Sequence, residues 1–154
     1  MNKEEIINLL YKNQLENVNI EHRLFYKDII RIASKINTDP FSPTECCIWN
    51  GAISYSYHNS KYINFWLKKK KQPLHRILYN NYKGNLPSNK YIRYLCPDSN
   101  SKGICCNINH IDIINNDNNI NNNTRPINNE NKKNYIIDIV DNNLNHDLFV
   151  IIFE

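Results

Sequence analysis

The spacing of apolar side chains near the start of the chain predicts a short amphipathic helix. Ile6, Leu9 and Leu10 recur at the intervals that place side chains on one helical face. Asn2 precedes them and is suited to cap the helix. Glu5 stands three residues later, where its carboxylate can return a hydrogen bond to the Asn2 backbone as in a capping box. We therefore expect a helix that begins directly after Asn2.

A second helix is expected from residue 20 to about residue 35, capped by Asn19. Its apolar residues gather near one face of a helix with 3.6 residues per turn, which is typical of a helix that packs on a core. The following segment, INTDPFSPTE, contains Pro40 and Pro43 and should be an irregular connection.

The pattern changes to short apolar and aromatic runs after residue 46. Residues 47–57 and 61–68 are rich in Ile, Tyr, Phe and Trp, which predicts two strands of a hairpin that turns around His58–Ser60. The basic run Lys68–Lys71 follows. Such a run usually forms a solvated turn, although on a sheet lying against a phosphate backbone it would also supply charge.

Proline and glycine delimit the next predicted elements. Pro73 should begin a helix through Tyr79, and Gly84 is suited to the end of that helix. Pro87 should separate the helix from a strand at Tyr91–Leu95.

The end of the chain combines asparagine-rich and apolar segments. Asp and Asn after His110 can cap a short helix, but Asn is a poor interior residue for a helix, so a loop should follow. The segments NYIIDIV (134–140) and LFVIIFE (148–154) read as two strands of a C-terminal hairpin.

Composition limits the class of protein. The chain has 154 residues, enough for one domain with a real core, and its net charge of +4 is compatible with a nucleic-acid partner without requiring one. It has no apolar segment of about twenty residues that would span a membrane. The N-terminus also lacks the apolar stretch of a signal peptide, so we expect an intracellular location: cytoplasm, nucleus or virion. The bias toward Asn, Lys, Ile and Tyr indicates an AT-rich genome, such as that of a large DNA virus of protists or of a protist itself.

The cysteines lie in two short segments, which favours a metal site. Cys46 and Cys47 are adjacent, and the other three cysteines lie at positions 96, 105 and 106, shortly before His110. In a reducing compartment, clustered cysteines favour metal binding over disulfides, and such a set of ligands suits a tetrahedral zinc ion. The alternative is that the cysteines are scattered small apolar residues.

Several motifs in this order resemble the zinc-containing HNH, or His-Me finger, endonucleases, in particular the phage and intron-encoded enzymes with a zinc-bound loop. The chain has CCIWNG from Cys46, LHRILY from Leu74 and GNLP from Gly84. It continues with YLC from Tyr94 and CCNINHI from Cys105, and an Asn follows nine residues after His110. The match covers about half of the chain.

The resemblance implies a small α+β domain: a zinc-stabilised ββα-metal finger with antiparallel hairpins, two N-terminal helices and a C-terminal β-hairpin. Together with the flanking elements predicted from the residue pattern, it divides the chain into an N-terminal helical arm (1–36), an HNH-like zinc-binding domain (44–124) and a C-terminal extension (125–154). It also implies four ligands of a structural zinc ion: Cys46, Cys96, Cys105 and His110. A rival ligand set replaces one cysteine with its neighbour, Cys47 or Cys106, and spacing does not decide between them.

The chain departs from the family at the catalytic position. In the relatives, the residue two positions before the Cys of this strand is a His that acts as general base, and here it is Tyr94. The later Asn, here Asn119, helps those enzymes to hold a divalent ion such as Mg²⁺ on the scissile phosphate. A tyrosine with an ordinary pKa of about 10 stays protonated near neutral pH, so it is a poor base. Loss of a positioned base reduces rates by about 10²–10⁴-fold, which predicts lost or weakened catalysis.

Among the relatives the strand face lies on DNA, so a DNA or RNA partner is expected. The side chains expected to contact phosphates are Lys68, Lys69, Lys70, Lys71, Arg76 and Arg93. Tyr55, Tyr57 and Trp66 are candidates for stacking or groove contacts. The alternative, favoured slightly for Trp66, is core packing or cross-strand pairing within a sheet. Three functions stay open: a non-catalytic nucleic-acid-binding module, an active divalent-metal-dependent endonuclease, and a structural component of a viral or other large assembly. A homodimer or another protein partner is compatible with each.

Overall fold

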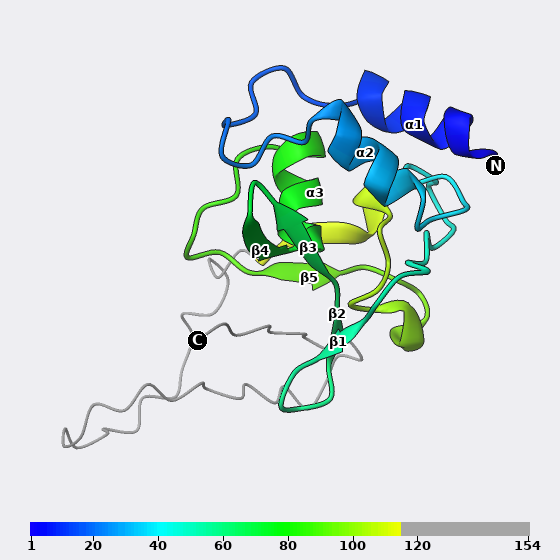
Figure 1. Cartoon of the computed structure of the whole chain (residues 1–154). Coiled ribbons are helices and arrows are strands. Elements are labelled where there is room, and N and C mark those ends of the chain that lie inside the picture. The colour runs from blue at the N-terminus through cyan, green and yellow to red at the C-terminus, as the bar shows by residue number, and fades with distance from the viewer. Residues whose placement is uncertain (115–154) are drawn as a thin grey trace. The chain divides into compact units, whose positions relative to one another are not determined.

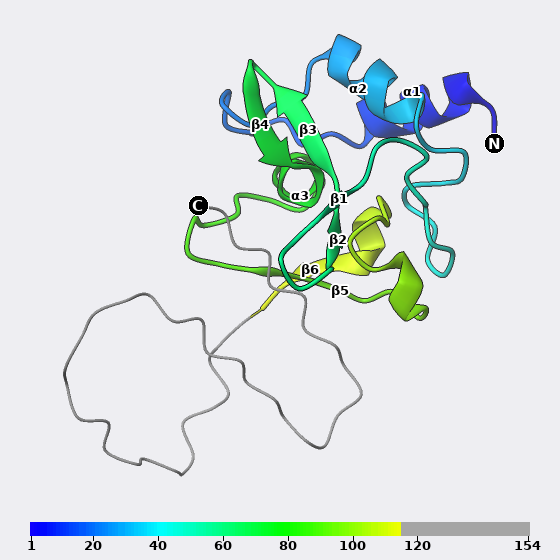
Figure 2. The ribbon, with the colours of Figure 1, turned by 60° about the horizontal axis from the view of Figure 1, so that its bottom comes forward.

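The computed structural model describes residues 1–114. This part of the chain is a small α+β fold with three α-helices and three two-stranded antiparallel sheets, and it confirms the predicted class at that level. Helices α1 (Lys3–Lys12) and α2 (Tyr26–Ala33) lie on one side of α3 (Leu74–Tyr82), and the hairpin β5–β6 lies on the other (Figures 1 and 2). The predicted C-terminal hairpin, the extension 125–154 and Asn119 lie outside the described residues.

Helix α1 begins where the sequence predicts, and its cap is the predicted one. The Asn2 side-chain oxygen accepts a hydrogen bond from the Glu5 N–H at 2.9 Å, and a Glu5 carboxylate oxygen accepts one from the Asn2 N–H at 2.9 Å. Each bond satisfies a backbone donor that the first turn of a helix cannot pair. The helix buries Ile6 and Leu10 in the core.

Helix α2 is shorter than the predicted helix 20–35. Asn19 does accept a hydrogen bond from the Glu21 N–H at 2.9 Å, but only an isolated turn follows. The Leu24 N–H donates instead to the side chain of Asn81 on α3 at 2.9 Å, which removes it from any helix starting at Asn19. The helix begins after Phe25, where the Asp28 carboxylate accepts the Phe25 N–H.

The first hairpin turns where predicted, but its strands are much shorter. β1 (Ser54–Tyr55) pairs with β2 (Lys61–Tyr62), and Asn59 takes the left-handed backbone conformation of a tight turn, with φ of 61°. Outside β1, the predicted first strand, 47–57, is irregular apart from an isolated bridge between Ile48 and Cys105. That bridge ties the early cysteine segment to the later one.

A second hairpin follows directly, and its return strand was not predicted. β3 (Asn64–Leu67) pairs with β4 (Lys70–Pro73), so half of the basic run is strand and half is turn. Lys68 and Lys69 form the turn, with φ of 50° and 65°. The left-handed conformation at both turn residues matches the twist of a two-residue hairpin, although Asn-Gly is the usual sequence there.

Helix α3 starts after Pro73 as predicted, and Gly84 lies just beyond its end with φ of 139°. Its fully buried Asn81 joins it to the N-terminal segment. The Asn81 amide oxygen accepts hydrogen bonds from Leu24 and Gln14, and its amide nitrogen donates to the carbonyls of His22 and Ile77, at 2.7–2.9 Å. All hydrogen-bonding positions of this buried amide are therefore used.

The third hairpin carries the loop that holds most of the cysteines. β5 (Ile92–Tyr94) confirms the predicted strand, and it pairs with β6 (Ile111–Ile113). The helix predicted soon after His110 is wrong for Ile111–Ile113, because Tyr94 and Ile111 pair across the hairpin and both are buried. Two short 3₁₀ turns, Ser99–Ser101 and Ile108–His110, shape the loop between the strands.

Candidate metal centre

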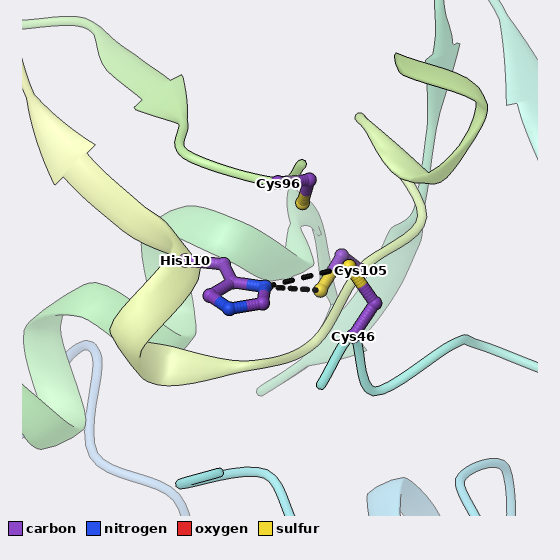
Figure 3. Close-up of side chains that lie close together, drawn as sticks. All are labelled: Cys46, Cys96, Cys105 and His110. Carbon is purple, nitrogen blue, oxygen red and sulfur yellow. Dashed lines mark hydrogen bonds between the residues drawn. The ribbon is translucent and has the colours of Figure 1, made fainter. Parts of the chain in front are cut away.

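Four side chains from three separate segments meet at the end of the β5–β6 hairpin. Cys46 precedes the Ile48 bridge, Cys96 follows β5, Cys105 forms the other half of the bridge, and His110 ends the second 3₁₀ turn. Their ligand atoms all lie within 4.8 Å of one another. Figure 3 shows the three sulfur atoms and the His110 ring directed toward a common point. The structure thus brings together the four residues that the resemblance implies.

The spacing of these atoms fits a tetrahedral ion such as zinc. Zinc lies about 2.3 Å from a thiolate sulfur and about 2.1 Å from an imidazole nitrogen, so a sulfur and a nitrogen sharing one tetrahedral zinc are about 3.6 Å apart. The Nδ1 atom of His110 lies 3.4 Å from the Cys46 sulfur and 3.7 Å from the Cys105 sulfur. The group can hold a metal through three sulfurs and Nδ1.

Asn107 connects the segment before Cys46 to the segment that carries Cys105 and His110, and the sequence analysis did not select it. Its side chain is fully buried and donates to the carbonyls of Ser42, at 2.8 Å, and Glu45, at 2.6 Å. Its backbone N–H points at the Cys105 sulfur, 3.4 Å away. Hydrogen bonds of this kind hold ligands in place, but the partners of Asn107 lie more than sixty positions earlier, so no local signal in the sequence identifies its role.

The loop between β5 and β6 comes close to the Lys61 backbone at Gly103. A Cβ atom built there would collide with the carbonyl oxygen of Lys61 in β2, and Gly103 has φ of 82°, which favours glycine. Next to the bridge between Ile48 and Cys105, the Cys106 N–H donates to the Cys47 carbonyl at 2.6 Å. The position of Cys105 is therefore fixed by backbone contacts on both sides.

The electrostatics of the cluster favour a bound cation. Hydrogen bonding from the Cys96 thiol, with further help from the Asn107 N–H, lowers the pKa of Cys105 to about 5. The same Cys96–Cys105 hydrogen bond, together with burial, raises the pKa of Cys96. Burial and the charge of Cys105 raise the pKa of Cys46. A divalent ion would stabilise the thiolate form of all three cysteines.

The two other cysteines lie outside this group. The Cys47 thiol points to the Thr38 carbonyl, 3.5 Å away, and burial raises the pKa of Cys47 to about 11. Burial also raises the pKa of Cys106 well above its ordinary value. Neither belongs to the group of ligand atoms found in residues 1–114, so the structure favours the set with Cys46 and Cys105 over the rival sets.

Tyr94 lies in the core beside the metal site. Its side chain is 7% exposed and its ring packs edge-on against that of His75, with centroids 5.8 Å apart. Burial, with a smaller effect from the negative charge of nearby cysteines, raises the pKa of Tyr94 well above 10. A phenol in this setting keeps its proton at every physiological pH.

Neither His75 nor His58 is better placed to act as a base. His75 is buried, its Nδ1 has no hydrogen-bond partner, and burial lowers its pKa to about 3. His58 is exposed in the turn between β1 and β2, where its ring contacts Tyr57.

The six predicted phosphate-contacting residues differ in how they are held. Arg76 donates to the carbonyls of Lys90, at 2.9 Å, and Pro87, at 3.2 Å, and Arg93 pairs with Asp112 at 3.4 Å. Lys68 lies over the ring of Phe25, and Lys70 pairs with Glu21 at 3.7 Å. Lys69 and Lys71 are exposed in the same hairpin. Contact with phosphates stays a prediction for all six.

The candidate stacking residues are on the surface. Tyr57 is 97% exposed, Tyr55 59% and Trp66 57%. The slightly favoured alternative for Trp66 is therefore wrong as to core packing, but Trp66 does lie in a cross-strand pair, opposite Lys71 in the β3–β4 register. The tryptophan of the CCIWNG motif, Trp49, is the one that packs in the core.

One curated relative is similar over most of the chain. It is the uncharacterised protein R328 of Acanthamoeba polyphaga mimivirus, with 42% identity over 111 residues, which is 71% of this chain. The chain spans 32% of the length of that relative. A viral relative fits the kind of source that the composition indicates. No protein-family model matches the chain, and no solved structure matches it. Across residues 1–114, none of the helices has both the length and the apolar character needed to cross a membrane.

Proposed function

We propose that this chain is an HNH-like scaffold, stabilised by a structural zinc ion, that binds nucleic acid and does not cleave it. The order of the motifs supports the scaffold, as does the meeting of Cys46, Cys96, Cys105 and His110 at the end of one β-hairpin. Four protein ligands leave no open coordination position for substrate or water, which is the arrangement of structural zinc sites.

The charge distribution carries the nucleic-acid part of the proposal. Between Cys46 and Pro97 the chain has nine lysines and arginines and no aspartate or glutamate. The net charge of the whole chain is only +4, so the positive charge is concentrated in the segment that forms β1 to β5 and α3. A concentration of one sign of charge favours a polyanionic partner and makes its binding sensitive to salt.

The environment of Tyr94 argues against catalysis. A general base must lose its proton near neutral pH and reach the water that it activates. Tyr94 is buried with a raised pKa, and its neighbour His75 is buried with a lowered one. Neither residue meets both conditions.

Three measurements on the purified full chain test the proposal. Elemental analysis should find about one zinc per chain. Fluorescence anisotropy with labelled oligonucleotides should show binding that weakens steeply between 50 and 200 mM salt. Incubation of DNA and RNA with Mg²⁺ or Mn²⁺ should leave them intact.

Each open alternative has its own signature in these experiments. Metal-dependent nicking that Asn119→Ala abolishes would select an active endonuclease and refute the proposal. Stoichiometric co-purification with a protein partner, without affinity for any nucleic acid, would select an assembly component.

A further inference from the structure

The outer face of the β3–β4 hairpin exposes an aromatic ring that the fold does not use. Along β3, Phe65 and Leu67 point into the core and are 4% and 0% exposed, whereas Trp66 between them is 57% exposed. An exposed tryptophan leaves a large apolar surface in water, and most tryptophans are largely buried. The backbone that carries it is held in place, because Arg31 donates to the Trp66 carbonyl at 2.9 Å. Trp66 is thus a surface ring on a well-anchored strand.

Two lysines of the same hairpin have charges with no partner among the described residues. The N-terminal segment engages Lys68 through Phe25 and Lys70 through Glu21. No hydrogen bond, ion pair or ring contact in residues 1–114 involves the ammonium groups of Lys69 and Lys71. Lys71 lies directly opposite Trp66 in the β3–β4 register. We call Trp66, Lys69 and Lys71 the Trp66 face.

The combination of an exposed indole with two unpaired ammonium groups suits one chemical class of ligand. The indole offers a flat π-surface on which a nucleobase can stack, and the ammonium groups can contact the phosphates on either side of that base. An acidic partner is also favoured because the segment around the hairpin lacks carboxylates from Cys46 to Pro97.

We propose that the Trp66 face binds single-stranded nucleic acid by stacking Trp66 on an unpaired base. The inference rests on the proposed function and makes it more specific. In a duplex, each base is stacked on its neighbours, so its π-face is not available to a side chain. In a single strand the base can leave its neighbours and lie on the indole. DNA and RNA strands share this chemistry.

The test compares single-stranded and duplex oligonucleotides on the zinc-loaded full chain. Fluorescence anisotropy with labelled oligo(dT), oligo(U) and a blunt DNA duplex should show tighter binding of both single strands than of the duplex. Stacking contributes a factor of roughly 5 to 150 per base, so Trp66→Leu should weaken single-strand binding by about tenfold. Trp66→Phe should restore part of it, because a phenyl ring can still stack.

Intrinsic fluorescence gives a second readout that a merely structural role would not change. The chain has two tryptophans, and Trp49 is 7% exposed, so oligo(dT) should quench mainly Trp66. Quenching should disappear in Trp66→Phe while Trp49 emission remains. Replacing Lys69 and Lys71 with Gln should lower the slope of log affinity against log salt by about 1.4 for a single strand.

Matched controls use equally exposed residues elsewhere. Tyr11→Leu removes a 61% exposed ring from α1, and replacing Lys3 and Lys27 with Gln removes two charges from α1 and α2. Tyr11→Leu should leave single-strand affinity unchanged, and the double Gln control should change the salt slope less than the Lys69 and Lys71 pair does. Equal or tighter binding of the duplex, or an unchanged affinity in Trp66→Leu, overturns the inference but leaves the proposed function standing. Absence of binding to all three oligonucleotides refutes both.

Discussion

The turn between β3 and β4 stores backbone strain, and glycine substitution should release it. Lys68 and Lys69 have φ of 50° and 65°, a conformation that costs an L-residue other than Gly or Asn about 1–2 kcal/mol. Glycine removes this cost but loses about 0.5–1 kcal/mol through the greater freedom of the unfolded chain. We therefore expect Lys69→Gly to raise the free energy of unfolding by about 0.5–1 kcal/mol.

The neighbouring residue provides an internal comparison. Lys68 has the same backbone conformation, but its ammonium group lies 5.0 Å from the centre of the Phe25 ring, a contact that contributes about 0.5–1 kcal/mol at an exposed site. Lys68→Gly loses this contact and should change stability little. Asn59→Gly, in the turn between β1 and β2, is a control with similar φ, because Asn tolerates φ of 61° and should gain only a few tenths of a kcal/mol.

The assay is urea unfolding of the zinc-loaded proteins, followed by circular dichroism at a fixed excess of zinc. A loss of stability in Lys69→Gly would refute the strain argument. An equal gain in Lys68→Gly and Lys69→Gly would show that the contact with Phe25 contributes nothing. Lys69→Gly should also bind single strands more weakly, so that stability and affinity change in opposite directions.

Four further predictions concern the core and the metal site. Asn81→Ala leaves several buried hydrogen-bonding groups unpaired and should lower the free energy of unfolding by about 3 kcal/mol in the same assay. Chelation of zinc, or Cys96→Ser, should unfold the loop between β5 and β6, and hydrogen exchange there would detect it. Tyr94→Phe should leave oligonucleotide affinity unchanged and create no cleavage; loss of an existing cleavage activity would show that the phenol takes part in chemistry. The pKa of His75 is lowered by burial, so protonation favours the unfolded state, and stability from this group is lost as pH falls from about 6.5 toward 3. As the pH is lowered from 7 to 5, the free energy of unfolding of His75→Phe should therefore rise relative to that of the unsubstituted protein. An unchanged difference over this range would contradict the lowered pKa of His75.

Local signals in the sequence were enough to predict several elements. The capping box of Asn2 and Glu5 fixes the start of α1, and Pro73 and Gly84 bound α3. The four residues of the candidate metal centre could also be predicted from the resemblance, although it left Cys47 and Cys106 open as replacements for their neighbours. In each case the decisive information lies within a few residues or in a known motif.

Long-range contacts explain what the sequence did not predict. The helix expected from residue 20 fails because Leu24 bonds to Asn81, 57 residues later. The strand at Ile111–Ile113 replaces a predicted helix start because it pairs with β5 across the cysteine loop. The role of Asn107 depends on carbonyls more than sixty positions earlier. No local pattern contains these partners.

The four residues of the candidate metal centre are unevenly distributed along the chain. Cys96, Cys105 and His110 lie within fifteen residues, whereas Cys46 is fifty residues earlier. Closing a loop of that length costs about 3.5 kcal/mol of chain entropy, while the three late ligands can gather locally. In the proposed zinc site, the three late ligands would therefore gather around the ion first, and Cys46 would complete the coordination shell last.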